Sequence, residues 1–370
     1  MSTRAARWLV HRPGDGRLDT VSQSNRLSAL PKLSAQTLAW ATDWDALFGR
    51  RAPIILEIGF GFGAFLAHLA RTHLDANIVG LEVSSRSLES TERLITRERL
   101  SNVRVIHTRA ETALHHLFRP AALADVHINF PDPWFKQGHI HRRLMQRDTL
   151  TTLVSRMTPG ARLYLATDIA DYATMSDGLL STTPGLENAL AAPYLHDPRA
   201  PELNRVVTKY EDKAQQAGRT CYYFVYWRTD APAPNVPVIE DLPMPHVVFA
   251  SPLPLDAMID SFEPIKFSVP LVDQAELTHI SFIAVYTGQT RRQPTALFEV
   301  HLSEPTIEQR IALMLLSKSD LPGAYTLQLG SLGHARPTTG VHWAVRALSD
   351  WLISLHPDAH MIDAKLQGVP

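Results

Sequence analysis

The stretch LEIGFGFGA, residues 56–64, joins an apolar run to a helical pattern. Its glycines Gly59, Gly61 and Gly63 predict a tight bend, in which the backbone comes close to a ligand that lies over the strand end. Glu82 closes the next apolar run, where a carboxylate accepts hydrogen bonds from both ribose hydroxyls of an adenosine. The stretch therefore predicts the first strand, turn and helix of an adenosine-binding α/β domain.

The cofactor of this domain is predicted by Glu57. Gly59-x-Gly61-x-x-Ala64 also satisfies the fingerprint of NAD-dependent enzymes, which place an acidic residue where Glu82 stands. A carboxylate two residues before the first glycine, however, repels a pyrophosphate and faces the cationic methionine portion of S-adenosyl-L-methionine. S-adenosyl-L-methionine is therefore the expected cofactor, and an NAD-dependent reductase is the competing interpretation at the level of the fold.

Between residues 51 and 230, apolar runs alternate with helical patterns. The predicted strands are Ile54–Ile58, Asn77–Glu82, Val103–Thr108, Asp125–Phe130, Ala161–Thr167 and Cys221–Arg228. The predicted helices are Phe62–Thr72, Arg86–Glu98, Ala110–Leu117, Arg142–Met157 and Ala170–Thr182. This alternation is typical of a Rossmann-like, doubly wound α/β sheet, here with an antiparallel last strand.

The regions on either side of this domain differ from it in pattern. Residues 1–50 form an N-terminal extension with a helix expected over Ser34–Phe48, and recurrent prolines make residues 231–254 a semi-rigid linker. Residues 255–370 predict a smaller α+β domain. Its expected strands lie at 267–269, 278–286, 296–302, 324–332 and 360–366; its expected helices are Thr306–Ser317 after Pro305, and Val341–Ser354 with Trp343 and Trp351 on a buried stripe.

The composition is that of a globular protein in which 45% of the 370 residues are apolar. No run reaches the ~18 to 20 apolar residues of a membrane helix, and a single cysteine excludes an internal disulfide. We therefore expect a cytoplasmic protein. Residues 231–370 hold 8 basic and 14 acidic residues, a net charge of −6 that leaves the rest at +5, which permits a polyanionic partner without requiring one.

The fourth predicted strand runs into HINFPDPWFK, residues 127–136, where two prolines fix the backbone around Asp132. A rigid carboxylate at this strand end lies beside the cofactor's methyl group and accepts the N1–H and 2-amino donors of a guanine. Guanine N7 already carries a lone pair, so methyl transfer requires no general base. Positioning and electrostatics then account for catalysis.

The motifs taken together resemble those of the tRNA (guanine-N7-)-methyltransferase family. FPDPWFK at 130–136 is followed by HIHRRL at 139–144, by ATD at 166–168, which ends in Asp168, and by TKYE at 208–211. The resemblance covers about residues 50–228. It implies methyl transfer to a guanosine of the tRNA variable loop, position 46 in that family, with Asp132 as the catalytic residue.

The resemblance also implies the other site residues. The expected cofactor-binding residues are Glu57, Gly59, Gly61, Gly63, Glu82, Arg109, Ala110, Glu111, Asn129 and Asp132. The expected substrate-binding residues are Lys136, His141, Arg142, Arg143, Asp168, Thr208, Lys209, Tyr210 and Glu211. The chain departs from the family at Arg109-Ala110-Glu111, where the family has Asp or Asn beside the alanine, and at Gln137-Gly138-His139, which replaces a string of lysines.

Several alternatives stay open. In one alternative, the methyl acceptor is another RNA or a small molecule. In another, the chain is a non-catalytic tRNA-binding homologue. His139 to Arg143 form a basic patch, which contacts the RNA backbone or is a solvated helix start. His115 and His116 are adjacent, so they are expected on a helix surface, and no metal is expected. Two basic segments of the last domain are expected in loops within reach of RNA, Arg291-Arg292 and His334-Ala335-Arg336. Otherwise this domain is expected to serve packing or oligomerisation. The chain is expected to be a monomer or a homodimer.

Overall fold

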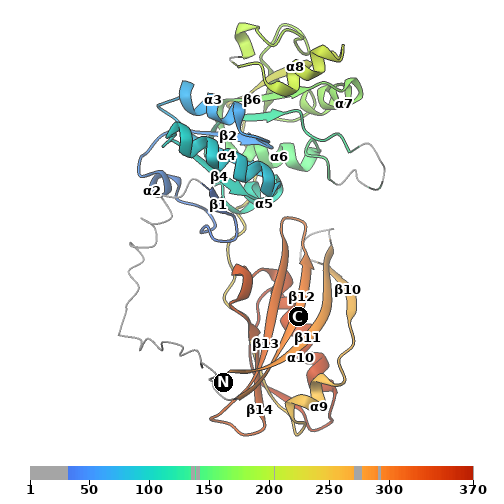
Figure 1. The fold of residues 1–370 in the computed structure, drawn as a ribbon. Helices are drawn as coiled ribbons and strands as arrows, with labels where there is room; N and C mark the ends of the chain where they lie inside the picture. The colour runs from blue at the N-terminus through green and yellow to red at the C-terminus, as the bar shows by residue number, and fades with distance from the viewer. Residues whose placement is uncertain are drawn as a thin grey trace, which may run out of the picture.

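The computed structural model describes residues 32–134, 138, 142–203, 205–270, 277–290 and 293–369. Within these ranges the chain forms one eight-stranded sheet and one seven-stranded sheet. The first belongs to the blue-to-green part of the ribbon and the second to the orange-to-red part (Figure 1). No helix of the described ranges is long and apolar enough to cross a membrane.

The first sheet is parallel except at one edge. Its strand order is β1 (Lys32–Ser34), β4 (Val103–His107), β3 (Asn77–Glu82), β2 (Ile54–Ile58), β5 (Leu123–Asn129), β6 (Met157–Thr167), β8 (Tyr222–Arg228) and β7 (Leu186–Asn188). The strands from β1 to β6 pair in parallel, whereas β8 is antiparallel to both β6 and β7. The chain order reverses between the neighbours β2 and β5, and such a switch point opens a crevice at the carboxyl ends of the strands.

Helices cover both faces of this sheet. They are α2 (Trp44–Phe48), α3 (Ala64–Thr72), α4 (Ser85–Glu98), α5 (Ala110–His116), α6 (Arg147–Arg156), α7 (Ala170–Leu180) and α8 (Lys209–Gln216), with a 3₁₀ turn η2 (Pro201–Leu203). Alternation along β2 divides the core, because Leu56 and Ile58 pack with α5, α6 and α7 while Ile55 packs with α3 and α4. The doubly wound class predicted from the sequence is therefore confirmed.

The N-terminal segment departs from its prediction. The prediction of a helix over Ser34–Phe48 is wrong except at α2. Residues 32–34 instead form strand β1, which adds to the sheet edge beside β4. Trp40 and Trp44 are buried there, and Trp44 stacks on Phe118 with ring centroids 4.8 Å apart. Packing against the domain thus overrides the helical spacing of these apolar residues.

The second sheet is antiparallel throughout. Its order is β10 (Ile265–Pro270), β11 (Leu277–Thr290), β12 (Gln293–Ser303), β13 (Glu308–Ser317), β14 (Ala324–Leu329), β9 (His246–Ala250) and β15 (His360–Lys365). The helices here are α9 (Leu255–Ile259) and α10 (Thr339–Ser354), with a 3₁₀ turn η3 (Leu332–His334). The apolar stripe of α10, which includes Val345 and Leu352, packs with Phe249 and Phe298 of the sheet.

Two predictions for this region are wrong. The expected helix Thr306–Ser317 is strand β13, in which exposed Glu308 and Arg310 alternate with buried Gln309 and Ile311. The expected linker 231–254 contains β9, which pairs with β14 and β15. Prolines precede β9 and follow it but are absent from its interior, which is the arrangement that a strand inside a sheet requires.

The two domains that contain these sheets also contact each other. Thr112 Oγ1 donates to the carbonyl of Thr306 at 2.7 Å, and His116 Nε2 lies 2.9 Å from Thr306 Oγ1. The Arg336 guanidinium lies 4.7 Å from the ring centroid of Trp40 and pairs with Asp241. His116 is therefore buried rather than on a helix surface, and Arg336 belongs to the contact between the domains rather than to a free loop.

Candidate active site

The glycine bend follows β2 at the switch point. Gly59, Gly61 and Gly63 have φ of 74°, 54° and 77°, a left-handed conformation that other residues adopt with strain. A Cβ on Gly63 would lie 2.5 Å from the side chain of Thr91, so this position is also closed by packing. At Gly59 and Gly61, apart from the adjoining residues in the chain, no atom of the described residues lies within 4 Å of such a Cβ. The bend therefore leaves open space above the strand end.

Glu82 ends β3 next to this bend. Its Oε2 accepts from the Gly61 amide at 2.9 Å, and its Oε1 accepts from the amides of Val83 and Ser84 at 2.9 and 3.0 Å. Three backbone donors fix the carboxylate in one orientation. Glu82 thus links the end of β3 to the glycine bend.

Glu57 lies in the floor of the site and is 1% exposed. Asn129 at the end of β5 donates from Nδ2 to Glu57 Oε1 at 3.2 Å, whereas Oε2 meets no donor among the described residues. Burial raises the pKa of Glu57 to about 8, although the Asn129 hydrogen bond and the charge of Arg205 act in the opposite direction. A buried oxygen without a donor is unfavourable, and it fits a ligand that brings one.

The segment after β5 carries Asp132 on a constrained backbone. Phe130 and Trp134 both have positive φ, 52° and 41°, and the Phe130 amide donates to the carbonyl of Ala166 at 2.8 Å. Asp132 itself is exposed. Arg143 Nε donates to the carbonyls of Pro133 and Trp134 at 3.0 and 3.1 Å. Arg143, which the sequence predicts to bind substrate, therefore holds the Asp132 segment in place.

Other predicted residues lie around the same edge of the sheet. Arg109 precedes α5 and its Nε lies 3.4 Å from Glu111 Oε2, and the amide of Thr108 donates to the carbonyl of Glu82 at 3.1 Å. The residues Arg109-Ala110-Glu111 thus begin beside the end of β3. Arg142 lies with its guanidinium carbon 5.3 Å from the Trp134 ring centroid, at the Asp132 segment.

The TKYE segment begins α8 as a capping box. Glu211 accepts from the Thr208 amide, and the Glu211 amide donates to Thr208 Oγ1 at 3.4 Å. Glu211 is fully buried and also accepts from the Tyr223 hydroxyl at 2.9 Å. Asp168, at the end of β6, pairs with Arg219. The side chains of Lys136, His141, Lys209 and Tyr210 lie outside the described residues.

One charged residue of the site was not predicted. Arg205 Nη2 lies 3.0 Å from Glu211 Oε1, and the Arg205 side chain is 5% exposed. Its guanidinium carbon lies 5.3 Å from the ring centroid of Phe65 and 4.9 Å from that of Tyr223. No sequence signal singles Arg205 out, because its partners come from α3, α8 and β8.

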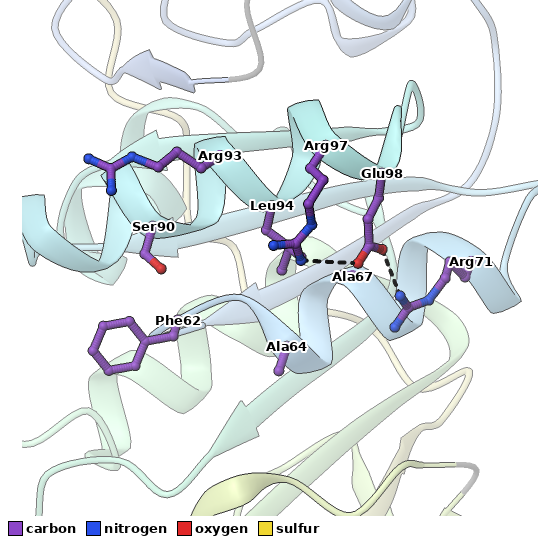
Figure 2. Close-up of a pocket in the computed structure, with 9 residues that line it drawn as sticks. All are labelled: Phe62, Ala64, Ala67, Arg71, Ser90, Arg93, Leu94, Arg97 and Glu98. Carbon is purple, nitrogen blue, oxygen red and sulfur yellow. Dashed lines mark hydrogen bonds and ion pairs between the residues drawn. The ribbon is translucent and has the colours of Figure 1, made fainter.

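A separate groove of about 600 Å³ lies between α3 and α4 (Figure 2). Glu98 pairs in it with Arg71 at 2.6 Å and with Arg97 at 3.6 Å, while Arg93 extends away from that pair. None of the predicted site residues that the structure describes lines this groove, although Phe62 of the glycine bend does. Among the described residues, no group of three His, Cys, Asp or Glu side chains is placed to hold a metal ion.

Open α/β sheets bind nucleotides where the strand order reverses, and the floor of this crevice carries the buried carboxyl group of Glu57, one oxygen of which has no partner among the described residues. The fold and site are therefore those of a Rossmann-like class I methyltransferase. The family described as "Putative methyltransferase" matches residues 51–224. The chain belongs to the tRNA (guanine-N(7)-)-methyltransferase family, as the following relatives establish.

The relatives are similar over part of this chain. The tRNA (guanine-N(7)-)-methyltransferase of Burkholderia cenocepacia (strain HI2424) is 42% identical over 184 residues, which are 50% of this chain and 70% of the relative. That of Cutibacterium acnes (strain DSM 16379 / KPA171202) is 38% identical over 230 residues, 62% of this chain and 77% of the relative. The crystal structure of the 16S rRNA methyltransferase KamB overlaps 50% of this chain and 93% of its own, with 14% identity and a TM-score of 0.39.

Proposed function

We propose that this chain transfers the methyl group of S-adenosyl-L-methionine to N7 of a guanosine in the variable loop of tRNA. The observation that carries the proposal is the pairing of Glu57 with Asn129, which brings the buried carboxylate of β2 to the strand end from which the Asp132 segment leaves. Family membership supports the choice of tRNA guanine as the acceptor. The cofactor supplies a methyl group on a positively charged sulfur.

The residues present fit that cofactor. The unpartnered Oε2 of buried Glu57 accepts a hydrogen bond from the ammonium of the methionine portion. Glu82, fixed by three backbone amides, retains one of its about four lone-pair sites, on Oε2, for a ribose hydroxyl. The glycine bend, which lies between Glu57 and Glu82 in the sequence, leaves open space at Gly59 and Gly61 that the cofactor can occupy.

Asp132 is the residue that we assign to the guanine. Its carboxylate accepts from N1–H and the 2-amino group, so the base is held at its Watson–Crick edge while N7 faces the methyl donor. Because N7 already has a lone pair, Asp132 takes no proton from the reacting atom. Its contribution is alignment and electrostatic stabilisation of the charge that moves onto the base.

The remaining predicted residues hold the tRNA or the segments that touch it. Arg142 lies at the Asp132 segment and is exposed, so it is placed to meet an RNA phosphate. Glu211 uses its oxygens on Thr208, Tyr223 and Arg205, and so it fixes the start of α8 rather than reading a base. We assign Lys136, His141, Asp168, Lys209 and Tyr210 to contacts with the tRNA.

The test replaces Asp132. Asp132→Ala should lower the rate of methyl transfer to tRNA by about 100-fold or more, the cost of losing one oriented polar group in an active site. S-adenosylhomocysteine affinity should fall by much less than the rate, because Asp132 is one of several expected cofactor contacts and Glu57 and Glu82 are unchanged. Methylation is measured with labelled cofactor and a tRNA transcript.

Two controls sharpen this test. Asp171→Ala removes an exposed carboxylate from the first turn of α7 and should leave the rate unchanged. A transcript in which the variable-loop guanosine is replaced by adenosine should accept no methyl group. Wild-type rates in Asp132→Ala would remove Asp132 from the mechanism, and full methylation of the altered transcript would exclude the variable loop.

A further inference from the structure

Arg205 is a buried cation beside the cofactor crevice. It precedes α8, and its guanidinium lies between the Phe65 ring, in the first turn of α3, and the Tyr223 ring of β8. Phe65 follows the last glycine of the bend by two residues. Arg205 therefore places a positive charge next to α3, the helix that follows the glycine bend, although Arg205 and α3 lie far apart in the sequence.

Its hydrogen bonding is incomplete. Nη2 forms an ion pair with Glu211 at 3.0 Å, but neither Nη2 nor Nε makes a hydrogen bond to an acceptor among the described residues. Glu57 Oε2 is likewise buried without a donor in the described part of the chain. Buried polar groups of native proteins are nearly always paired. An unpaired donor and an unpaired acceptor in one site therefore indicate a ligand that carries both complements.

The two side chains share one face of the sheet. Glu57 and His127 are register partners on β2 and β5, so their side chains point to the same face. Phe65 contacts His127 on that face, with ring centroids 5.3 Å apart, and Arg205 lies over Phe65. In agreement with this placement, the charge of Arg205 acts to lower the pKa of Glu57 and of His127.

We propose that Arg205 and Glu57 together bind the amino-acid portion of S-adenosylmethionine, the guanidinium taking the α-carboxylate and Glu57 Oε2 taking the α-ammonium. The inference rests on the proposed function, because it concerns the cofactor of that reaction. A zwitterion supplies an acceptor for Arg205 Nε and a donor for Glu57 in one rigid group. Charge-assisted hydrogen bonds of this kind are short and strong in a buried site.

The experiment compares three ligands by isothermal titration calorimetry. S-adenosylhomocysteine carries both charged groups, S-adenosyl-3-thiopropylamine lacks the carboxylate, and 5′-methylthioadenosine lacks the whole amino-acid portion. In wild type, loss of the carboxylate should weaken binding by about 10- to 100-fold, the range for a hydrogen bond to a charged group. In Arg205→Met, which keeps an apolar stem between the two rings, the first two ligands should bind within about threefold of each other.

The matched control is Arg93→Met, which removes an exposed arginine of α4 that lines the α3–α4 groove (Figure 2). It should leave all three affinities unchanged. The affinity for 5′-methylthioadenosine should also be unchanged in Arg205→Met, which shows that the pocket is intact. If Arg205→Met does not fold, the wild-type comparison of the two longer ligands still decides, because equal affinities would mean that no cation holds the carboxylate.

Other outcomes overturn the inference in recognisable ways. Equal loss of S-adenosylhomocysteine and 5′-methylthioadenosine in Arg205→Met would make Arg205 a packing residue. Loss of tRNA affinity with unchanged S-adenosylhomocysteine affinity would assign the guanidinium to an RNA phosphate. The proposed function fails separately: wild type that binds S-adenosylhomocysteine with the predicted pattern but methylates no tRNA guanine would retain Arg205 as a cofactor residue and reject the acceptor.

Discussion

At the residue scale, the site is dominated by one carboxyl group in an unusual protonation state. Burial holds the pKa of Glu57 at about 8, above its ordinary value of 4.5, while Asn129 and Arg205 lower it and Glu82 raises it. Its register partner His127 is neutral, because burial lowers its pKa to about 3. Without a ligand, the folded protein therefore keeps Glu57 protonated at neutral pH.

Because the pKa of Glu57 differs between the folded and the unfolded chain, folding stability depends on pH. The unfolded chain ionises Glu57 near its ordinary pKa, whereas the folded chain ionises it only near pH 8. The contribution of Glu57 to folding stability is fully present below the unfolded pKa and is lost as the pH rises through the folded pKa. A ligand ammonium requires the ionised form, so binding below pH 8 releases a proton.

We therefore predict that S-adenosylhomocysteine affinity rises between about pH 6 and pH 8, by up to about tenfold per unit, and then levels off. Glu57→Gln should bind more weakly and show a flatter profile. Calorimetry in two buffers of different ionisation enthalpy measures the proton release directly. A wild-type affinity that is constant over this range, with no proton released, would contradict the assignment of Glu57.

Residue patterns placed several of these side chains at neighbouring strand ends, but they did not point to Arg205. Glu57, Glu82 and the glycines follow from the spacing around one strand end, and the structure brings them together. Arg205 could not be predicted, because its significance comes from Phe65, Glu211 and Tyr223, which only the fold brings to it. Arg143 was predicted, but its geometry gives it the backbone of the Asp132 segment as a partner.

At the element scale, two short segments that carry predicted substrate-binding residues are held in place by hydrogen bonds. The Asp132 segment is held by Arg143, and the TKYE segment is held by its own capping box at the start of α8. The pattern of a threonine followed three residues later by a glutamate also signals a helix N-terminus in the sequence. The motif was predicted from the family resemblance alone, and helix α8 was not predicted.

The capping box gives a prediction for α8. Thr208→Ala removes the hydroxyl that accepts from the Glu211 amide, which should destabilise the helix start by about 1 kcal/mol. Hydrogen exchange of the 205–217 peptide, followed by mass spectrometry, should become about fivefold faster. Thr208→Ser retains the hydroxyl and serves as the control. Unchanged exchange in Thr208→Ala would show that the cap contributes nothing to this helix.

Strand β13 shows where element prediction fails. The run IALMLL at 311–316 is apolar at nearly every position, so neither a period of two nor one of 3.6 stands out, and Pro305 favours a helix start. The sheet decides the conformation, since β13 pairs along its length with β12 and then with β14. Such pairing is a long-range property that the local pattern does not contain.

At the scale of the whole molecule, the chain combines a methyltransferase domain with an antiparallel β-sheet domain. The family match covers 51–224, whereas the second sheet begins with β9 at His246. The domains meet at His116 and Thr306, and at Arg336, whose guanidinium donates to the carbonyls of Gln36 and Leu38 at 3.2 and 2.9 Å. These contacts were not predictable, because each joins residues almost 200 or more positions apart.

The proposed function specifies the atom that receives the methyl group, N7 of a tRNA guanosine. The full chain is incubated with isotopically labelled S-adenosylmethionine and unmodified tRNA, and the RNA is digested to nucleosides and analysed by mass spectrometry, with Asp132→Ala as the inactive comparison. We expect labelled 7-methylguanosine from tRNA treated with wild type and almost none from tRNA treated with the variant. Label in a different nucleoside, or no labelled tRNA from protein that demonstrably binds the cofactor, would contradict the proposed function.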